Sequence, residues 1–307
     1  MNGLSKTAMM GTGLVVLYTL MISSADAITK FIARGYAAPQ LFALSGLIVV
    51  ALAWVSARAG GTRQSLRTSC PRVMALRAGL TVVGSAAFFY AFRYLPFAEV
   101  FVFIGLMPIF AGLFSAPILG EHVRLMAWGA LAAGFIGVLC LFPGGPSSVS
   151  FGHLIALFAC LCGTLSMVLA RYIGRHETNA LAQVFYTNLA LALAMGVALP
   201  FVFEPMPLTD LAWVCAYALF LFVARWLLVV SLRLLAAYAV TPLMNLQFVW
   251  MVGLGAVFFG EVPAANIYLG VAIVIGSGVF LVWDQMQPEG APSVPGWPWL
   301  RWFRLAR

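Results

Sequence analysis

Charged side chains are scarce in this sequence. Asp, Glu, Lys and Arg make up 8% of the 307 residues, whereas an ordinary soluble domain is about 25% charged. Acidic residues are the rarer kind, at 9 against 17 Lys and Arg, while hydrophobic residues reach 63%. No single water-surrounded core buries that much apolar surface, so the composition excludes an ordinary soluble domain.

The sequence also lacks the usual groupings of metal-binding and disulfide-forming residues. The cysteines are five, an odd number, and Cys160 and Cys162 are two positions apart, so on a helix they point in different directions. The histidines, His122, His153 and His176, are scattered near the ends of apolar runs. We therefore expect no disulfide, no metal site and no cofactor.

Patterns typical of two rival classes are missing as well. The sequence has no paired-carboxylate cluster, no nucleotide-binding loop and no Gly-x-Ser-x-Gly elbow, which argues against an intramembrane enzyme. It has no carbonyl-filter sequence and no ring of charge, which argues against a channel. An intramembrane enzyme and a channel remain the alternatives to a transporter.

What the sequence has is ten apolar stretches joined by short polar links. Crossing the hydrocarbon layer of about 30 Å takes about 20 apolar residues. A backbone exposed to lipid must satisfy its hydrogen bonds within its own segment, and the alternation of barrel strands is missing, so we expect an all-α membrane protein of about ten transmembrane helices. The expected spans are 8–33, 38–57, 73–93, 97–118, 125–142, 152–172, 179–203, 210–233, 236–259 and 266–283.

Basic residues predict the orientation of the chain in an inner membrane. One side of the expected bundle collects Lys6, Arg58, Arg63, Arg67, Arg72, Arg124, Arg171, Arg175, Arg301, Arg304 and Arg307. The other side holds only Lys30, Arg34 and Arg93. Since basic residues concentrate in cytoplasmic loops, both termini are predicted to be cytoplasmic. The net charge of +8 therefore reports topology and not a nucleic-acid partner.

The two halves of the chain resemble each other at a shift of about 140 residues. The matching pieces are Lys30–Arg34 with Arg171–Arg175, Gln40–Phe42 with Gln183–Phe185, and Gly120-Glu121 with Gly260-Glu261. Each half holds five elements, an odd number, so the second half enters the membrane from the opposite face and the repeat is inverted. Inverted repeats are common in secondary transporters, whose substrate site lies at the repeat interface near the midplane.

This repeat predicts how the chain is divided. Residues 1–142 form the first repeat, with spans one to five, and 151–283 form the second, with spans six to ten. The segment 143–150 begins with Pro-Gly-Gly-Pro-Ser-Ser, which has turn chemistry and suits a linker. Residues 284–307 are predicted to be a cytoplasmic tail.

Several short motifs resemble the ten-helix EamA-type proteins of the drug/metabolite transporter superfamily, which carry two copies of a five-helix unit. They are the run from Phe89 to Glu99, Pro108, Gly120-Glu121, and the run from Phe258 to Pro263. Two departures are Ser45, where members often have Arg, and Phe248, where a counterpart of Pro108 would fall. Pro242 lies earlier instead, as in members similar to proposed riboflavin and S-adenosylmethionine carriers. The resemblance covers residues 8–283 and implies transport, but not a substrate.

Charged residues inside the expected spans are candidates for function, because a charge within a membrane is costly. Asp26 and Lys30 lie four positions apart on one helical face, either as a charge pair or as a coupling or substrate-amine site. Arg225 has no acid within a turn and binds either an anionic substrate group or Asp26 or Glu99. Glu99 itself either favours a helix N-terminus or joins such a pair.

Polar and aromatic residues recur in spans three, seven and nine. They are Tyr90, Tyr186, Asn188, Asn245, Gln247 and Trp250. Some are expected to line a substrate cavity, although interhelical hydrogen bonds explain individual members equally well. The sequence thus predicts a secondary transporter that moves a small polar or zwitterionic metabolite, amino-acid-like or vitamin- or cofactor-like, by alternating access. Its partners are the metabolite and the lipid bilayer, and a homodimer is left open.

Overall fold

A computed structural model shows how these segments pack. It describes residues 2–32, 35–59, 66–94, 103–120, 125–139, 150–177, 179–235 and 243–259, together with positions 100, 240, 269, 272, 273, 276, 277 and 280. Every regular element in these ranges is a helix. The expected linker 143–149, most of span 266–283 and the tail 284–307 lie outside the described residues.

Six helices of the described part are long and apolar enough to cross a membrane. They are α1 (Asn2–Ile32), α2 (Ala38–Ala59), α3 (Pro71–Tyr94), α7 (Phe151–His176), α8 (Ala180–Ala198) and α9 (Leu208–Leu234). Each matches one expected span, because an uninterrupted apolar run of this length has no other way to satisfy its backbone in lipid. Shorter elements are α5 (Met107–Leu119), α6 (Leu125–Leu139), α11 (Gln247–Phe259) and the 3-10 turn Leu199–Phe201 that follows α8.

Two expected spans, 97–118 and 236–259, are not continuous helices. Helical backbone stops at a turn formed by residues 105 and 106, and again at a turn formed by residues 245 and 246. In both turns a short-range bond replaces the helical one: the Leu106 amide donates to the Phe103 carbonyl, and the Leu246 amide donates to the Leu243 carbonyl, each at 3.0 Å. A proline at the start of α5, which has no amide hydrogen to donate, accounts for the first break.

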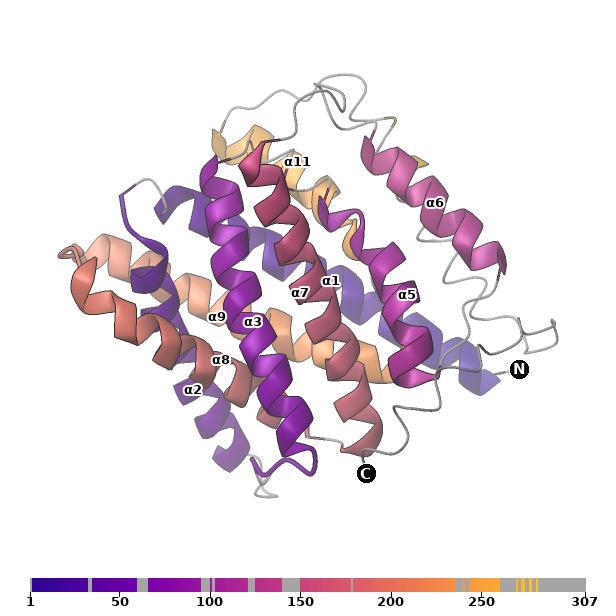
Figure 1. Ribbon diagram of the computed structural model, residues 1–307, viewed down its shortest axis with the longest axis horizontal. Coiled ribbons are helices and arrows are strands. Elements are labelled where there is room, and N and C mark those ends of the chain that lie inside the picture. The colour runs from indigo at the N-terminus through magenta and orange to yellow at the C-terminus, as the bar shows by residue number, and fades with distance from the viewer. Residues whose placement is uncertain are drawn as a thin grey trace.

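The helices pack in pairs that are far apart in the sequence. α3 packs along α7, α1 along α9, and α2 along α8, while α5 contacts α7 and α11 contacts α1. In Figure 1, α3 and α7 lie side by side at the front, and α6 stands at one edge of the bundle. Behind α3 and α7, α1 and α9 lie along each other and run across the direction of the front pair. The centre of the bundle is therefore enclosed by α1, α3, α7 and α9.

Small residues allow two of these pairs to approach closely. A Cβ atom added to Gly46 of α2 would lie 3.0 Å from the Cβ of Ala192 and 3.2 Å from the carbonyl oxygen of Asn188, both in α8. One added to Gly84 of α3 would lie 3.3 Å from the Cβ of Cys162 in α7. Because lipid provides no hydrophobic drive between helices, such close packing is a main source of their association.

Hydrogen bonds join the two halves at both ends of the bundle. In the first end contact, the Gln40 side chain donates to the Glu204 carbonyl at 2.6 Å and accepts from the Glu204 amide at 2.9 Å, and the Tyr36 hydroxyl donates to Asp210 at 2.6 Å. Gln40 lies at the start of α2 and Glu204 follows the end of α8, so these two helices run antiparallel.

The second end contact is built around one carboxylate. Oε2 of Glu177 accepts hydrogen bonds from the Ser69 amide at 2.7 Å, the Ser69 hydroxyl at 3.0 Å and the Thr68 hydroxyl at 2.9 Å. Glu177 lies just before the start of α8, whereas Glu204 lies beyond its end. The two end contacts therefore lie at opposite ends of the bundle.

Candidate functional site

A cavity of about 270 Å³ lies in the centre of the bundle. Its lining comes from α1, α2, α3, α5, α7, α8, α9 and α11, so both halves of the chain contribute. Much of the wall is apolar, including Phe42, Phe88, Phe89 and Met167, with a few hydroxyls such as those of Tyr18 and Tyr217. An apolar cavity with a few polar groups aimed into it is the usual form of a small-molecule site.

Three charged side chains face this cavity: Asp26 from α1, Arg77 from α3 and Arg225 from α9. Within the described part of the chain, Asp26 forms no ion pair with either arginine, and the Arg225 guanidinium has no hydrogen-bond acceptor. The two guanidinium groups are close enough to repel each other electrostatically. The cavity therefore presents two cations and one anion that do not neutralise one another by direct contact.

Arg77 is 8% exposed and is held from one side only. Its Nη1 donates to the Gln183 carbonyl at 3.2 Å, while its Nε has no acceptor among the described residues. One turn further along α3, the Thr81 hydroxyl bonds to the backbone carbonyl of Arg77 and to the Ser166 hydroxyl of α7, each at 2.9 Å. These bonds fix the backbone that carries Arg77 against α7. A buried donor without an acceptor is costly, and a ligand that supplies an acceptor removes that cost.

Sequence reasoning overlooked Arg77, although a signal for it exists. Arg77, Thr81 and Ser85 are spaced four apart within one apolar span, and all three line the cavity. Residues at this spacing share one face of a helix. A polar stripe that continues two turns into an expected membrane span would have indicated a cavity-facing arginine.

The two helix breaks also meet at the cavity. Ile104 and Met107 flank the first break, Met244 and Gln247 flank the second, and all four line the cavity. Met107 and Gln247 are the first residues of α5 and α11, so the N-terminal ends of both helices open towards the cavity. The N-terminal end of a helix carries a partial positive charge through the helix dipole.

Comparison with known proteins finds similarity to transporters. Residues 5–142 match the EamA-like transporter family. This half of the chain is an EamA-like transporter domain. Over 235 residues, 75% of this chain and 76% of the relative, the sequence is 28% identical to a riboflavin transporter of Rhizobium johnstonii. It is also 26% identical to a pseudopaline exporter of Pseudomonas aeruginosa over 272 residues, which cover 86% of this chain and 93% of the exporter.

A solved crystal structure shares the fold of this chain. Its TM-score is 0.74 at 21% sequence identity, and the match covers 93% of this chain and 99% of that one. The resemblance to EamA-type drug/metabolite transporters that the sequence predicted is thus confirmed. The chain is a multi-pass membrane protein of the transporter class and not an enzyme.

The cavity includes some of the residues singled out from the sequence and leaves out others. Asp26, Arg225 and Gln247 line it, whereas Lys30, one turn beyond Asp26, is not among the lining residues. Glu99 lies outside the described residues. The pairing of Arg225 with Asp26 that the sequence left open is not formed in the described part of the chain, so Arg225 stays available to a ligand.

Two tyrosines singled out from the sequence lie away from the cavity lining. Tyr90 is 43% exposed and stacks on Tyr94 with a ring separation of 6.5 Å. Tyr186 is half-buried and packs edge-on against Phe185. In this conformation neither ring contacts the space where a substrate would lie.

The remaining candidates make contacts between or within helices. The Trp250 indole donates to the Thr19 hydroxyl at 3.0 Å and so ties α11 to α1. The Asn188 amide donates to the Val184 carbonyl at 2.7 Å within α8. Asn245 is 1% exposed and lies in the second helix break. Asn188 and Asn245 each keep an amide oxygen without a donor among the described residues, so both have unused bonding capacity.

Proposed function

We propose that this protein is a secondary transporter of the inner membrane that moves a small polar or zwitterionic organic metabolite by alternating access. The central cavity is its substrate site. The observation that supports this most directly is the meeting of three unneutralised charged side chains and two helix breaks at one cavity between the halves. Interrupted helices at the midplane are a recurrent way to build transporter sites.

The packing pattern supports a pair of inverted five-helix repeats. α1 packs on α9 as α7 packs on α3, α11 packs on α1 as α5 packs on α7, and α2 and α8 pack on each other. If each helix is replaced by the helix at the same position in the other half, each of these contacts becomes a contact in the same set. The helix breaks, about 140 positions apart, fit the same exchange. We assign the repeats to 1–142 and 151–283, with a linker at 143–150 and a tail at 284–307.

The two end contacts support alternating access. Each joins the turn between the first two helices of one half to the start of the third helix of the other half, at opposite ends of the bundle. A carrier that exposes one central site to alternate sides needs closures of this kind at both ends. Breaking one set while the other holds opens the cavity on one side only.

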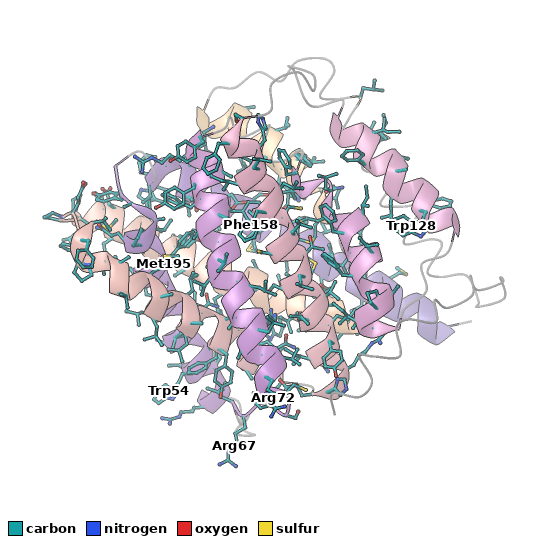
Figure 2. The ribbon with its side chains drawn as sticks, viewed as in Figure 1. Trp54, Arg67, Arg72, Trp128, Phe158 and Met195 are labelled. Atoms are coloured by element: carbon teal, nitrogen blue, oxygen red, sulfur yellow. The ribbon has the colours of Figure 1, made fainter. Side chains whose placement is uncertain are left out.

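The distribution of basic residues supports cytoplasmic termini. Figure 2 shows Arg67 and Arg72 together at one end of the bundle, near Trp54. Arg58 lies over the Trp54 ring at 3.6 Å, an arrangement that suits a membrane–water boundary. The end of the bundle that holds the second end contact is therefore assigned to the cytoplasm.

Two further parts of the proposal concern coupling and substrate. Asp26 is the group in the cavity that suits coupling to a proton or a substrate amine. Lys30 belongs to the same helix as Asp26, and Glu99 belongs to the same half of the chain. The relatives named riboflavin transporter and pseudopaline exporter favour a vitamin- or cofactor-like or an amino-acid-like substrate.

Flux in proteoliposomes tests this function. The purified protein is reconstituted and loaded with riboflavin or with members of a metabolite library, and uptake of labelled solute is followed. A carrier predicts saturable flux, counterflow, and competition by one metabolite. Flux that rises linearly with concentration and shows no counterflow would indicate a channel instead, and chemical conversion of the solute would indicate an enzyme.

A further inference from the structure

We infer that the cavity selects organic anions and binds a carboxylate between the guanidinium groups of Arg77 and Arg225. This inference rests on the proposed function, since it assigns the substrate class of the same cavity. It goes beyond the relatives named riboflavin transporter, because riboflavin carries no carboxylate. The contacts of the two arginines and the position of the two helix ends point to it, and the single aspartate defines the other end of the ligand.

The arginines have donors to spare in the right place. Arg77 uses Nη1 on the Gln183 carbonyl, and its Nε remains without an acceptor although the side chain is 8% exposed. Arg225, from α9, also lines the cavity and has no acceptor within the described residues. A guanidinium presents a planar fork of donors that matches the two oxygens of a carboxylate. Two such forks facing one cavity form a clamp that a carboxylate completes.

The helix breaks add positive potential to the same space. α5 and α11 are each 13 residues long and begin at Met107 and Gln247, which line the cavity. Helix N-termini favour negative charge through their dipole, although the amides of Ile109, Phe110, Phe248 and Val249 already donate to backbone carbonyls of the preceding turn. Two arginines and two helix ends therefore favour an anion, against one carboxylate that disfavours it.

Asp26 sets the other end of the ligand. It is the one acidic side chain among the described cavity-lining residues, and it forms no ion pair with the arginines. Its oxygens accept a hydrogen bond from an ammonium or hydroxyl group. Phe88, Phe89 and Met107 supply apolar wall for the body of the molecule. The ligand is thus a carboxylate with an apolar body and a hydrogen-bond donor.

Matched pairs of probes that differ only in charge test this inference. The full-length protein in detergent is heated with 4-hydroxybenzoate or 4-hydroxybenzamide, with indole-3-acetate or indole-3-acetamide, and with the cation tryptamine. A ligand that binds the folded state raises its melting temperature. We expect stabilisation by the carboxylates and little or none by the amides and tryptamine. Equal stabilisation by the amides or tryptamine, or no stabilisation by either carboxylate, would overturn the inference.

Variants locate the effect. Arg225→Gln and Arg77→Lys should each weaken carboxylate binding by roughly tenfold or more, since each removes charge-assisted hydrogen bonds. Arg77→Lys keeps the charge and a donor for the Gln183 carbonyl, so it preserves the fold better than a neutral residue. Arg58→Gln, at the bundle end, is the matched control and should bind as the unmodified protein does. Unchanged carboxylate binding in both cavity variants would contradict the clamp.

Flux measurements separate failure of this inference from failure of the proposed function. Saturable flux of neutral riboflavin, without flux of the carboxylates, leaves the transporter in place and overturns the anion site. Saturable flux of a carboxylate that its own amide does not inhibit supports both. Absence of saturable flux for every probe counts against the proposed function itself.

Discussion

The Tyr36 hydroxyl donates a 2.6 Å hydrogen bond to Oδ2 of Asp210, 174 positions further along the chain. This bond raises the pKa of Tyr36 above its ordinary value, so the hydroxyl keeps its proton and keeps donating to a higher pH than an ordinary tyrosine would. Glu177 holds Ser69 in the corresponding way at the other end. The two halves are therefore fastened to each other at both ends by different residues, which can be released separately.

Releasing one end contact should open the cavity to one side. In a cysteine-free background, Ser85→Cys places a reporter thiol in the cavity lining. Tyr36→Phe removes one hydrogen bond and keeps the ring, so a membrane-impermeant thiol reagent added from outside should label the reporter several-fold faster. Glu177→Gln should accelerate labelling from the cytoplasmic side instead. Acceleration from the same side by both substitutions would contradict the assignment of the contacts to opposite ends.

Cys70 should report the charge of Glu177. Burial raises the pKa of the Cys70 thiol, and the Glu177 carboxylate raises it further because it disfavours a second negative charge nearby. In a variant that retains Cys70 as its sole cysteine, the rate of alkylation should begin to rise at a higher pH than it does for a free thiol. Glu177→Gln removes the carboxylate charge, so the whole rate profile should shift to lower pH. A profile that does not move would show that the carboxylate does not reach the thiol.

Arg225 should be essential for transport but not for insertion. Arg225→Lys keeps the charge and loses the fork, and Arg225→Ala loses both. Both should reduce flux in proteoliposomes by tenfold or more, while the amount of protein in the membrane stays within about twofold of normal. Trp226→Phe, at the next position with 40% of the side chain exposed, is a suitable control. Normal flux in Arg225→Ala would remove Arg225 from the site.

Reporter fusions should place the ends of the repeats on opposite sides of the membrane. A cytoplasm-active reporter fused after Arg307 is expected to be active, and the same reporter inserted within 143–150 is expected to be inactive. A periplasm-active reporter should give the reverse pattern. Activity of one reporter at both positions would exclude an odd number of spans per repeat.

Gly46 and Gly79 should differ in tolerance to a larger side chain. Gly46 is pressed against Ala192 in α8, whereas nothing lies within 4 Å of a Cβ added to Gly79 in α3. Gly46→Leu should therefore force α2 from α8 and lower stability by about 1–3 kcal/mol, as overpacking does. Gly79→Leu should leave the melting temperature of the purified protein nearly unchanged. Similar losses for both would show that helix propensity, and not packing, decides the outcome.

The long helices were predictable because their length in lipid is dictated by hydropathy alone. The breaks at residues 105–106 and 245–246 were not, because apolar residues continue through both turns and keep the hydropathy of the run high. Pro108 was noticed as a feature inside an expected span, yet a proline bends, ends or begins a helix according to its surroundings. The second break has no proline within two residues on either side, so tertiary packing determines it.

The composition of the site was harder to predict than the helices. Arg77 and Tyr90 belong to the same helix and are 13 positions apart, which is about 220° around an α-helix of 3.6 residues per turn. One therefore faces the cavity and the other faces outward. The sequence shows both residues within an apolar run but does not show which face the other half of the chain covers. Asp26 and Arg225 were found because a charge deep in a span is conspicuous on any face.

The fixed charges around the cavity and the charge of the substrate respond differently to the membrane voltage. Arg77, Arg225 and Asp26 are anchored to helices and return with the carrier, so only the charge of the substrate and of any coupled proton crosses the membrane in a complete cycle. Each elementary charge that crosses a potential of 100 mV gains or loses about 2.3 kcal/mol. Where the cytoplasm is negative, a monoanion carried alone is therefore driven outward by the membrane voltage. Its uptake requires a coupled cation, exchange for another anion, or a concentration gradient steep enough to offset the voltage.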